Sequence, residues 1–290
     1  MSIFCLGSIN ADYFYSVPHI PSPGETLPAT GMSSGLGGKG ANQSVAAARA
    51  GSTVHHIGAV GPGSDWILER LTSFGVGTEH IAILEEPTGH AIINVAADGE
   101  NAIVILAGAN GCQDLGRFQN AMADAGRGDI LLLQNETNLQ VEAAKFATEI
   151  GLRVLYSAAP FDSQAAAAVL PYTDTLLLNE TEAAQLEAAL ETTLHSLPVK
   201  NVIVTLGANG VRWIETETGN TVEIPGTPVK AVDTTGAGDT FAGYFAAGLD
   251  AGDSVPTALE FAGRAAALKV TRHGTADAIP SREEVLSFSS

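Results

Sequence analysis

Residues 129–157 read DILLLQNETNLQVEAAKFATEIGLRVLYS, with two short apolar runs on either side of an Ala-rich segment. In the Ala-rich segment, apolar residues recur at spacings of three and four, which is typical of a helix. Each apolar run is short and bounded by turn residues, which is typical of a parallel strand buried on both faces. The stretch therefore predicts a strand–helix–strand unit whose strands are parallel.

The same alternation extends in both directions along the chain. Strand-like runs lie at 3–7, 53–60, 129–134, 153–157, 174–179 and 201–207, and helix-like segments lie at 41–51, 64–75, 139–151 and 180–190. This rhythm predicts the α/β class, with a doubly wound, mostly parallel sheet and helices on both of its faces.

Two stretches without helical periodicity interrupt the pattern. The second is a candidate hairpin, because alternating apolar runs flank Asp98-Gly99, a dipeptide that favours a tight turn. We expect the excursions at 12–36 and 88–108 to form a small antiparallel β lid, inserted into a single domain that spans residues 1–290. The outer apolar face of this lid is expected to carry Phe14, Ile92 and Val104.

Composition and charge exclude several classes of protein. The chain has 290 residues, with 14 Lys and Arg against 32 Asp and Glu, and a formal net charge of −18. Nucleic acids and anionic membranes need dense Lys and Arg, so neither is expected as a partner. Cys5 and Cys112 cannot build a disulfide framework, and MSIFCLG does not resemble a secretory signal, so a cytoplasmic protein is expected. The seven histidines show no metal-ligand spacing.

The segment VDTTGAGDTFAGYFAAGL (232–249) contains the strongest chemical signal. Its apolar residues follow a helical stripe, which predicts a helix that begins near Ala237. Gly236 and Gly238 allow backbone N–H groups to converge at the start of this helix, where the helix dipole also favours an anion. Asp239 would lie beside that anion. Such a carboxylate either takes a proton from an attacking hydroxyl group or only stabilises the helix N-terminus, and the segment alone leaves both open.

The glycine-rich segment GLGGKGANQSVAAARAG (35–51) formally matches the dinucleotide-binding pattern G-x-G-x-x-G. Its context excludes that interpretation, because no buried strand precedes it and no acidic residue follows about 20 residues later. A P-loop is also excluded, since glycine follows Lys39 where Ser or Thr is needed. What remains is a Gly37-Gly38 hinge, a cation at Lys39 and an amide at Asn42, which suit sugar hydroxyl groups.

Asn10 and Asp12 follow the first predicted strand. Ligands of open α/β sheets bind beyond the carboxyl ends of strands, and residues two apart in an extended segment point the same way. The pair could therefore grip neighbouring hydroxyl groups, or it could form only an Asx turn.

Five segments occur in one order along the chain: GSINAD (7–12), GGKGANQ (37–43), NETE (179–182), TLGANG (205–210) and DTTGAGDTF (233–241). Together they resemble the ribokinase-like (PfkB) family of carbohydrate kinases, and the resemblance covers essentially the whole chain. Within that family, GSINAD, PGET (23–26), GGKGANQ and AGANG (107–111) are most similar to the ribose kinases.

The resemblance implies a set of site residues. The sugar would be held by Asn10, Asp12, Gly38, Lys39, Asn42 and Glu136, next to the catalytic base Asp239. The anion hole would be formed by Gly236, Ala237 and Gly238. The nucleotide would be bound by Asn179, Thr205, Gly207, Gly210, Gly238 and Gly263, and Mg²⁺ would be organised through water by Glu182.

The implied activity is transfer of the γ-phosphoryl group of ATP to a primary hydroxyl of a small sugar, with O5 of D-ribose as the expected acceptor. Another pentose, a nucleoside or a keto-deoxy sugar acid stays open as the substrate, because SAAP (157–160) and Gly263 depart from the family pattern. A non-catalytic sugar-binding protein on the same fold is the alternative outside this class.

The resemblance also implies a monovalent cation and a homodimer. The cation, K⁺, would lie among oxygens of Asp233, Thr235, Lys269, Arg272 and Gly274, although Ala278 replaces a residue that is often Ser. Its charge would hold the 233–238 loop for phosphoryl transfer. Alternatively, Asp233 only caps the following helix. The dimer would form through the lid, because so small a sheet with an apolar face is unstable alone.

Overall fold

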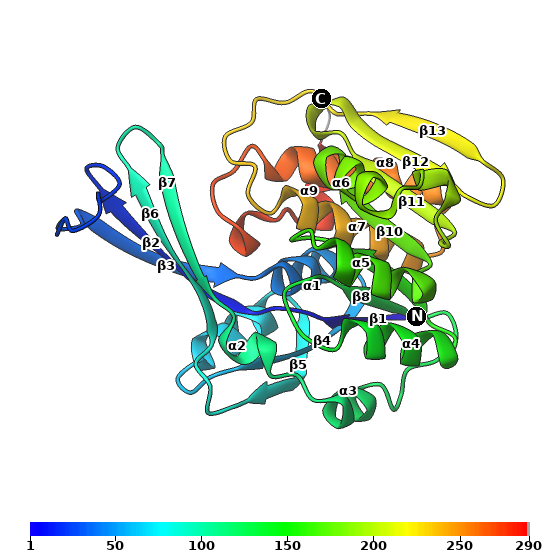
Figure 1. The fold of residues 1–290 in the computed structure, drawn as a ribbon, viewed down its shortest axis with the longest axis horizontal. Helices are drawn as coiled ribbons and strands as arrows, with labels where there is room; N and C mark the ends of the chain where they lie inside the picture. Colours follow the sequence, from blue (N-terminus) through cyan, green and yellow to red (C-terminus); the bar gives the residue numbers. More distant parts are fainter. Residues whose placement is uncertain (289–290) are drawn as a thin grey trace.

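The computed structural model describes residues 1–288, which form two β-sheets with helices packed around the larger one (Figure 1). In this part of the chain the large sheet has nine strands in the order β13-β12-β11-β10-β9-β8-β1-β4-β5. The small sheet has four strands in the order β3-β2-β6-β7 and projects from one side of the main body.

The large sheet consists of β1 (Ser2–Leu6), β4 (Thr53–Val60), β5 (Val76–Ile83), β8 (Ile130–Leu133), β9 (Arg153–Ser157), β10 (Thr175–Asn179), β11 (Asn201–Thr205), β12 (Gly210–Glu215) and β13 (Asn220–Pro225). The small sheet consists of β2 (Asn10–Val17), β3 (Gly31–Gly37), β6 (Gly89–Ala96) and β7 (Asn101–Leu106). The helices are α1 (Lys39–Arg49), α2 (Asp65–Ser73), α3 (Leu115–Ala121), α4 (Gln140–Glu149), α5 (Ser163–Val169), α6 (Glu180–Leu190), α7 (Ala237–Asp250), α8 (Val255–Lys269) and α9 (Arg282–Ser287). Among the helices described, none has both the length and the apolar character needed to cross a membrane.

The large sheet confirms the predicted doubly wound α/β class. Strands β8 and β9 are parallel neighbours joined through α4, which is the unit predicted from residues 129–157. The pairings from β11 through to β5 are parallel. Strands β12 and β13 add an antiparallel edge that the sequence patterns did not indicate. The residues of β13 are mostly exposed, so this strand lacks the continuous apolar run of a buried one.

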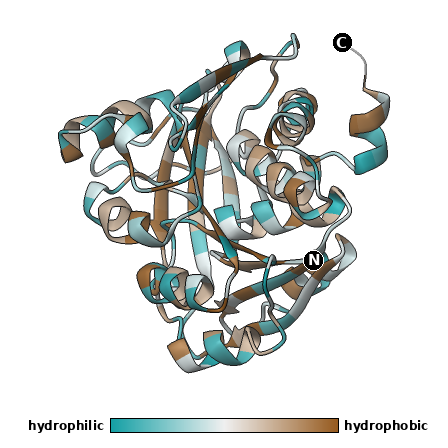
Figure 2. Ribbon diagram, turned by 90° about the vertical axis from the view of Figure 1, so that its right-hand side faces the viewer, coloured by the Kyte–Doolittle hydropathy of each residue, from teal (hydrophilic) through white to brown (hydrophobic). Residues whose placement is uncertain are grey.

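The two faces of the large sheet bury separate cores, and β1 contributes to both. Ile3 and Cys5 belong to the core under α1 and α7, whereas Phe4 and Leu6 belong to the core on the other face. This division follows from the alternation of side chains along a strand. Figure 2 shows mostly hydrophobic strands between helices that carry both hydrophobic and hydrophilic residues.

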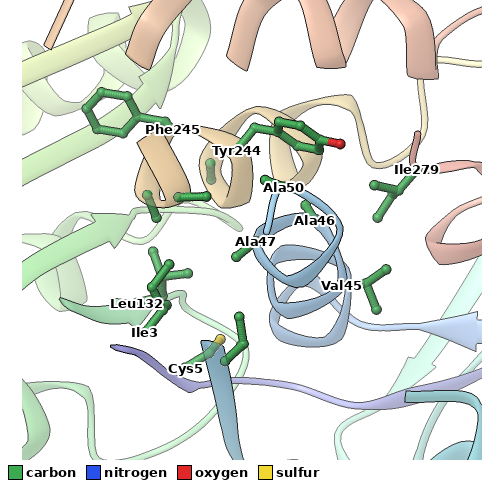
Figure 3. Packing of buried hydrophobic residues seen from close by; sticks show 14 of the residues in the cluster. Ile3, Cys5, Val45, Ala46, Ala47, Ala50, Leu132, Tyr244, Phe245 and Ile279 are labelled. Atoms are coloured by element: carbon green, nitrogen blue, oxygen red, sulfur yellow. The ribbon is translucent and has the colours of Figure 1, made fainter. Parts of the chain in front are cut away.

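Helices α1 and α7 cross closely because small residues line their contact (Figure 3). A Cβ atom on Gly243 would lie 2.4 Å from the carbonyl oxygen of Gln43 and 2.5 Å from the Cβ of Ala46. Only glycine therefore permits this approach. The crossing brings the first turns of the two helices together, so that Asn42 and Gln43 lie against Asp239.

The small sheet is built from two antiparallel pairs, β2–β3 and β6–β7, joined by a parallel pairing of β2 with β6. The hairpin expected around Asp98-Gly99 connects β6 to β7. The expected lid was wholly antiparallel, but its central pairing, β2 with β6, is parallel. The reason is that β2 follows the carboxyl end of β1 and β6 follows the carboxyl end of β5, and β1 and β5 both belong to the parallel part of the large sheet. The two excursions therefore start in the same direction.

One expectation about the small sheet is wrong. Ile92 pairs with Val104, whereas Phe14 pairs with Ile93. Because paired residues share a face, Phe14 lies on the face that carries Asp12, opposite the face of Ile92 and Val104. The register of β2 on β6 decides this, and a shift by one residue would reverse it.

Candidate active site

Helix α7 begins at Ala237, as the sequence predicts, and the residue before it has a left-handed backbone. Gly236 has φ 72° and ψ 9°, a conformation that favours glycine. We call residues 234–238 the anion loop. Asp239 follows in the first turn of α7 and is 7% exposed. The helix N-terminus and the carboxylate therefore lie next to each other, in the arrangement that the motif predicts.

The Asp239 carboxylate is held by side-chain amides. Asn42 Nδ2 donates to Oδ2 at 3.0 Å, and Gln43 Nε2 donates to Oδ1 at 3.2 Å. Gln134 Nε2 in turn donates to Gln43 Oε1 at 2.8 Å. Sequence reasoning missed Gln43 and Gln134, although the first lies within GGKGANQ and the second is the last residue of the strand predicted at 129–134. These amides fix the direction of the carboxylate.

Lys39 and Asp239 both line one cavity. The charge of Asp239 is the largest influence on Lys39 and raises the pKa of its ammonium group. The backbone N–H of Lys39 donates to Glu136 Oε2 at 3.0 Å. The residues that line the cavity are Lys39, Ser157, Ala159, Leu177, Leu178, Asn179, Glu182, Thr205, Gly236, Gly238, Asp239 and Phe241. Of the residues expected to bind the sugar, Lys39 and Asp239 line this cavity together with residues expected to bind phosphates.

The polar pair that follows β1 lies at the base of the small sheet. Asn10 and Asp12 are both buried on β2 and share a face. Asn110, which sequence reasoning did not single out within AGANG, donates from Nδ2 to Asn10 Oδ1 at 2.8 Å. Burial, and secondly the charge of Glu136, raises the pKa of Asp12 to about 6. The negative charge of Glu136 therefore acts on the carboxyl group of Asp12.

The residues expected to bind the nucleotide are only partly brought together. Asn179, Thr205 and Gly238 line the cavity, and so does Glu182. Asn179 and Glu182 form a capping box at the start of α6, in which each side chain accepts the backbone N–H of the other at 2.9 Å. The structure places three expected residues outside the cavity lining, namely Gly207, Gly210 and Gly263.

The segments expected around a monovalent cation meet, but an ammonium group already lies among them. Asp233 accepts the backbone N–H groups of Thr235 and Gly274, each at 2.9 Å. Lys269 Nζ donates to the backbone carbonyl of Asp233 at 3.1 Å, and the carbonyl of Lys269 accepts the N–H of Arg272. Both carboxylate oxygens of Asp233 and the carbonyl oxygen of Lys269, which were expected to coordinate the cation, thus already accept hydrogen bonds. K⁺ would also meet a fixed positive charge, so these residues do not fit the expected ion.

The expectation that the histidines share no metal-ligand arrangement is wrong for two of them. Ligand atoms of His55, Glu79 and His80 lie within 4.8 Å of one another on β4 and β5. An irregularity in the pairing of β4 with β5, between His55 and Ile57, interrupts the regular register at this point. The group lies on the other side of β1 from the cavity residues of β9, β10 and β11.

Known proteins of similar sequence and structure span the whole of this chain. The model of the pfkB family carbohydrate kinases matches residues 1–282. The chain is 39% identical to the ribokinase of Haemophilus influenzae, over 98% of this chain and 96% of that protein. It is 33% identical to the deoxyribokinase of Salmonella typhi, over 98% and 97%. The solved structure of Arabidopsis thaliana ribokinase complexed with ribose and ATP matches with a TM-score of 0.87 and 31% identity, covering 99% of each chain.

Proposed function

Because this chain belongs to the pfkB family of carbohydrate kinases, we propose that it transfers the γ-phosphoryl group of ATP to O5 of D-ribose. One observation carries the proposal. The carboxylate of Asp239 lies on the wall of a cavity that Gly236 and Gly238 of the anion loop also line. A carboxylate beside an anion site is unfavourable unless it has a proton to accept, and a sugar hydroxyl supplies that proton.

The proposed reaction is an in-line transfer. Asp239 accepts the proton of the O5 hydroxyl, and O5 forms a bond to the γ-phosphorus while the bond to the bridging oxygen of the β-phosphate breaks, which releases ADP. The backbone N–H groups of Gly236 and Gly238 stabilise the charge that spreads over the phosphoryl oxygens. The N–H of Ala237, also expected in the anion hole, already donates to the carbonyl of Thr234 at 3.2 Å and would have to leave it to take part. Lys39 contributes a positive charge on the same wall.

Glu182 fits the role of organising Mg²⁺ through water. One of its carboxylate oxygens accepts the backbone N–H of Asn179, and the residue lines the cavity. Carboxylate oxygens and water are the ligands that Mg²⁺ prefers. When bound, Mg²⁺ offsets the negative charge of the nucleotide phosphates.

The polar residues expected to hold the sugar support a small polyol as the acceptor. Asn10, Asp12, Asn42 and Glu136 supply amide donors and carboxylate acceptors, which suit neighbouring hydroxyl groups. Ribose agrees with the similarity to ribokinases. 2-Deoxyribose is the second candidate, because the chain is also similar to a deoxyribokinase.

A substrate panel tests the proposal. Coupled detection of ADP with ribose, 2-deoxyribose, other pentoses, nucleosides and keto-deoxy sugar acids should give the highest kcat/KM for ribose, and NMR of the product should place the phosphate on O5. A preference for another substrate would correct the acceptor alone. Ribose binding without ADP from any substrate would instead favour the non-catalytic alternative. Because ATP is the co-substrate, we place the enzyme in the cytoplasm.

We further propose that the small sheet acts as a lid and joins two copies of the chain. Large apolar residues on its edge strand β7 are exposed, including Val104 at 67% and Ile105 at 66%. Soluble proteins rarely leave such an edge uncovered. The same surface on a second copy would cover it symmetrically, and movement about Gly37-Gly38 would close the lid over the sugar.

A further inference from the structure

Lys269 is a fully buried lysine that the reaction scheme above does not use. It is the last residue of α8, and its exposure is 0%. Lysine is seldom fully buried, because its ammonium group then loses its water. The group needs acceptors inside the protein, and Nζ donates to the backbone carbonyl of Asp233 at 3.1 Å.

Two carboxylates act on this ammonium group. The pKa of Lys269 is lowered, because burial lowers it by more than the charges of Asp233 and then Asp239 raise it. The effect is mutual, because Lys269 is one of the groups that lower the pKa of Asp233. Opposite charges favour the charged form of both partners even without direct contact, and here the printed contact of Nζ is with the backbone carbonyl of Asp233.

Asp233 connects Lys269 to the anion loop. Its Oδ1 accepts the N–H of Thr235, which lies within the loop, and its Oδ2 accepts the N–H of Gly274. The ammonium group thus holds the backbone at the residue that precedes the loop, while the carboxylate of the same residue holds the loop itself. Lys269 is not among the residues that line the cavity, so it acts through Asp233.

We propose that the Lys269 ammonium group serves as a built-in monovalent cation, which balances Asp233 and positions the anion loop, so that the enzyme needs no K⁺. This inference rests on the proposed kinase function. Lys269 is a positioning residue, since it reaches the phosphoryl group only through the loop. The charge is covalently attached, so its presence does not depend on the salt in solution.

The wild-type enzyme gives the first test. Initial rates at saturating ribose and ATP should differ by less than about twofold between KCl and choline chloride, because matched ionic strength leaves screening equal. The thermal midpoint should also be the same in the two salts, since no specific ion binds the folded state. A wild-type rate that requires K⁺ would overturn the proposal.

Lys269→Ala gives the second test, because it removes the charge and opens a space where the side chain lay. In choline chloride its kcat should fall at least tenfold, though by less than the roughly 10²–10³-fold loss on removing a direct oxyanion donor. K⁺ or NH₄⁺ should restore the rate saturably, and the larger tetramethylammonium ion should not. The variant should also gain a K⁺-dependent rise in thermal midpoint.

Matched variants separate positioning from folding. Lys145→Ala removes an exposed lysine of α4 and should show no dependence on the cation. Lys269→Met keeps the bulk of the side chain without its charge, so it should lose activity and resist rescue. A folded Lys269→Ala protein whose loss is equal in every salt would assign Lys269 a packing role only. Absence of ADP from the wild type in all salts would contradict the kinase function instead, and the thermal shifts would still decide whether Lys269 replaces an ion.

Discussion

At the scale of single residues, the environment of Asp239 explains how a buried carboxylate is kept ready for a proton. Two amide donors, Asn42 and Gln43, hold its oxygens. Within the residues described, Asn42 Oδ1 has no hydrogen-bond partner. If an amide replaced the Asp239 carboxylate, the amide of Asn42 could turn over and accept a hydrogen bond from it, because Oδ1 gives up no other bond.

Asp239→Asn should lower kcat by roughly 10²–10⁴-fold, the usual contribution of a general base. The fold should be retained, because a turned Asn42 amide accepts a hydrogen bond from the new side chain. Ribose and ATP should bind with nearly unchanged affinity, since the anion loop presents backbone groups. Steady-state kinetics combined with calorimetric binding checks this, and turnover close to that of the wild type would remove Asp239 from the mechanism.

The ionised carboxylate of Asp12 lowers the free energy of unfolding, by an amount that depends on pH. Its pKa of about 6 in the folded protein lies above the value of about 3.9 in an unfolded chain. The folded state therefore binds this proton more tightly, and the free energy of unfolding decreases as pH rises from about 4 to about 6. Above that range the charged carboxylate is retained at the expense of stability, which supports a role in binding.

Asp12→Asn should therefore stabilise the protein by about 1–3 kcal/mol near neutral pH, and by much less near pH 4, where the aspartate is already protonated. The KM for the sugar should rise, because a charge-assisted hydrogen bond is lost. Urea unfolding at the two pH values, together with kinetics at neutral pH, measures both effects. An equal change in stability at the two pH values would contradict the assignment.

At the scale of elements, the crossing of α1 and α7 builds the proposed active site. Asn42 and Gln43 come from the first helix and Asp239 from the second, so the hydrogen bonds among them depend on the distance between the helix axes. Gly243 sets that distance, because its missing side chain leaves room for the backbone of α1.

Gly243→Ala should lower the free energy of unfolding by about 1–3 kcal/mol, because the new methyl group overlaps backbone atoms that cannot rotate away. Gly263→Ala in α8 is the matched control. Nothing lies within 4 Å of a Cβ atom at that position, so the control should gain about 0.5–1 kcal/mol from helix propensity. Urea unfolding of both variants checks the pair, and similar values for the two would show that the helices can move apart freely.

At the scale of the whole molecule, the small sheet stands away from the main body with apolar residues on both of its faces. Ile92 and Val104 share one face, and Ile103 and Ile105 are exposed on the same edge strand as Val104. A four-stranded sheet that is apolar on both sides needs further cover. A second copy of the chain supplies it in the proposed dimer.

Val104→Glu should convert the dimer to a monomer, because the charge would be buried in the interface without a partner. Val222→Glu on β13 is the control, since this valine is exposed at the opposite edge of the large sheet. Light scattering should give twice the chain mass of 29.7 kDa for the wild type and the control. A wild-type monomer at micromolar concentration would contradict the dimer.

The sequence by itself determined the local structure and the identity of the main chemical groups. Periods of two and of three to four residues depend only on neighbours in the chain, so the strand–helix units and the start of α7 at Ala237 could be predicted. The segment DTTGAGDTF likewise placed Asp239 in the first helical turn, because the glycines and the carboxylate are close in sequence.

Only the tertiary structure decided how distant segments meet. The register of β2 on β6 placed Phe14 on the face opposite Ile92 and Val104, and no local pattern specifies a pairing between strands so far apart in the chain. Gln134 reaches Gln43, and Lys269 reaches Asp233, across long sequence separations. From the sequence, Lys269 was expected only to offer its backbone oxygen, with several other residues, to a monovalent cation. In the fold the Lys269 side chain is buried, and a buried ammonium group needs a hydrogen-bond acceptor inside the protein. It finds one in the backbone carbonyl of Asp233, beside the anion loop.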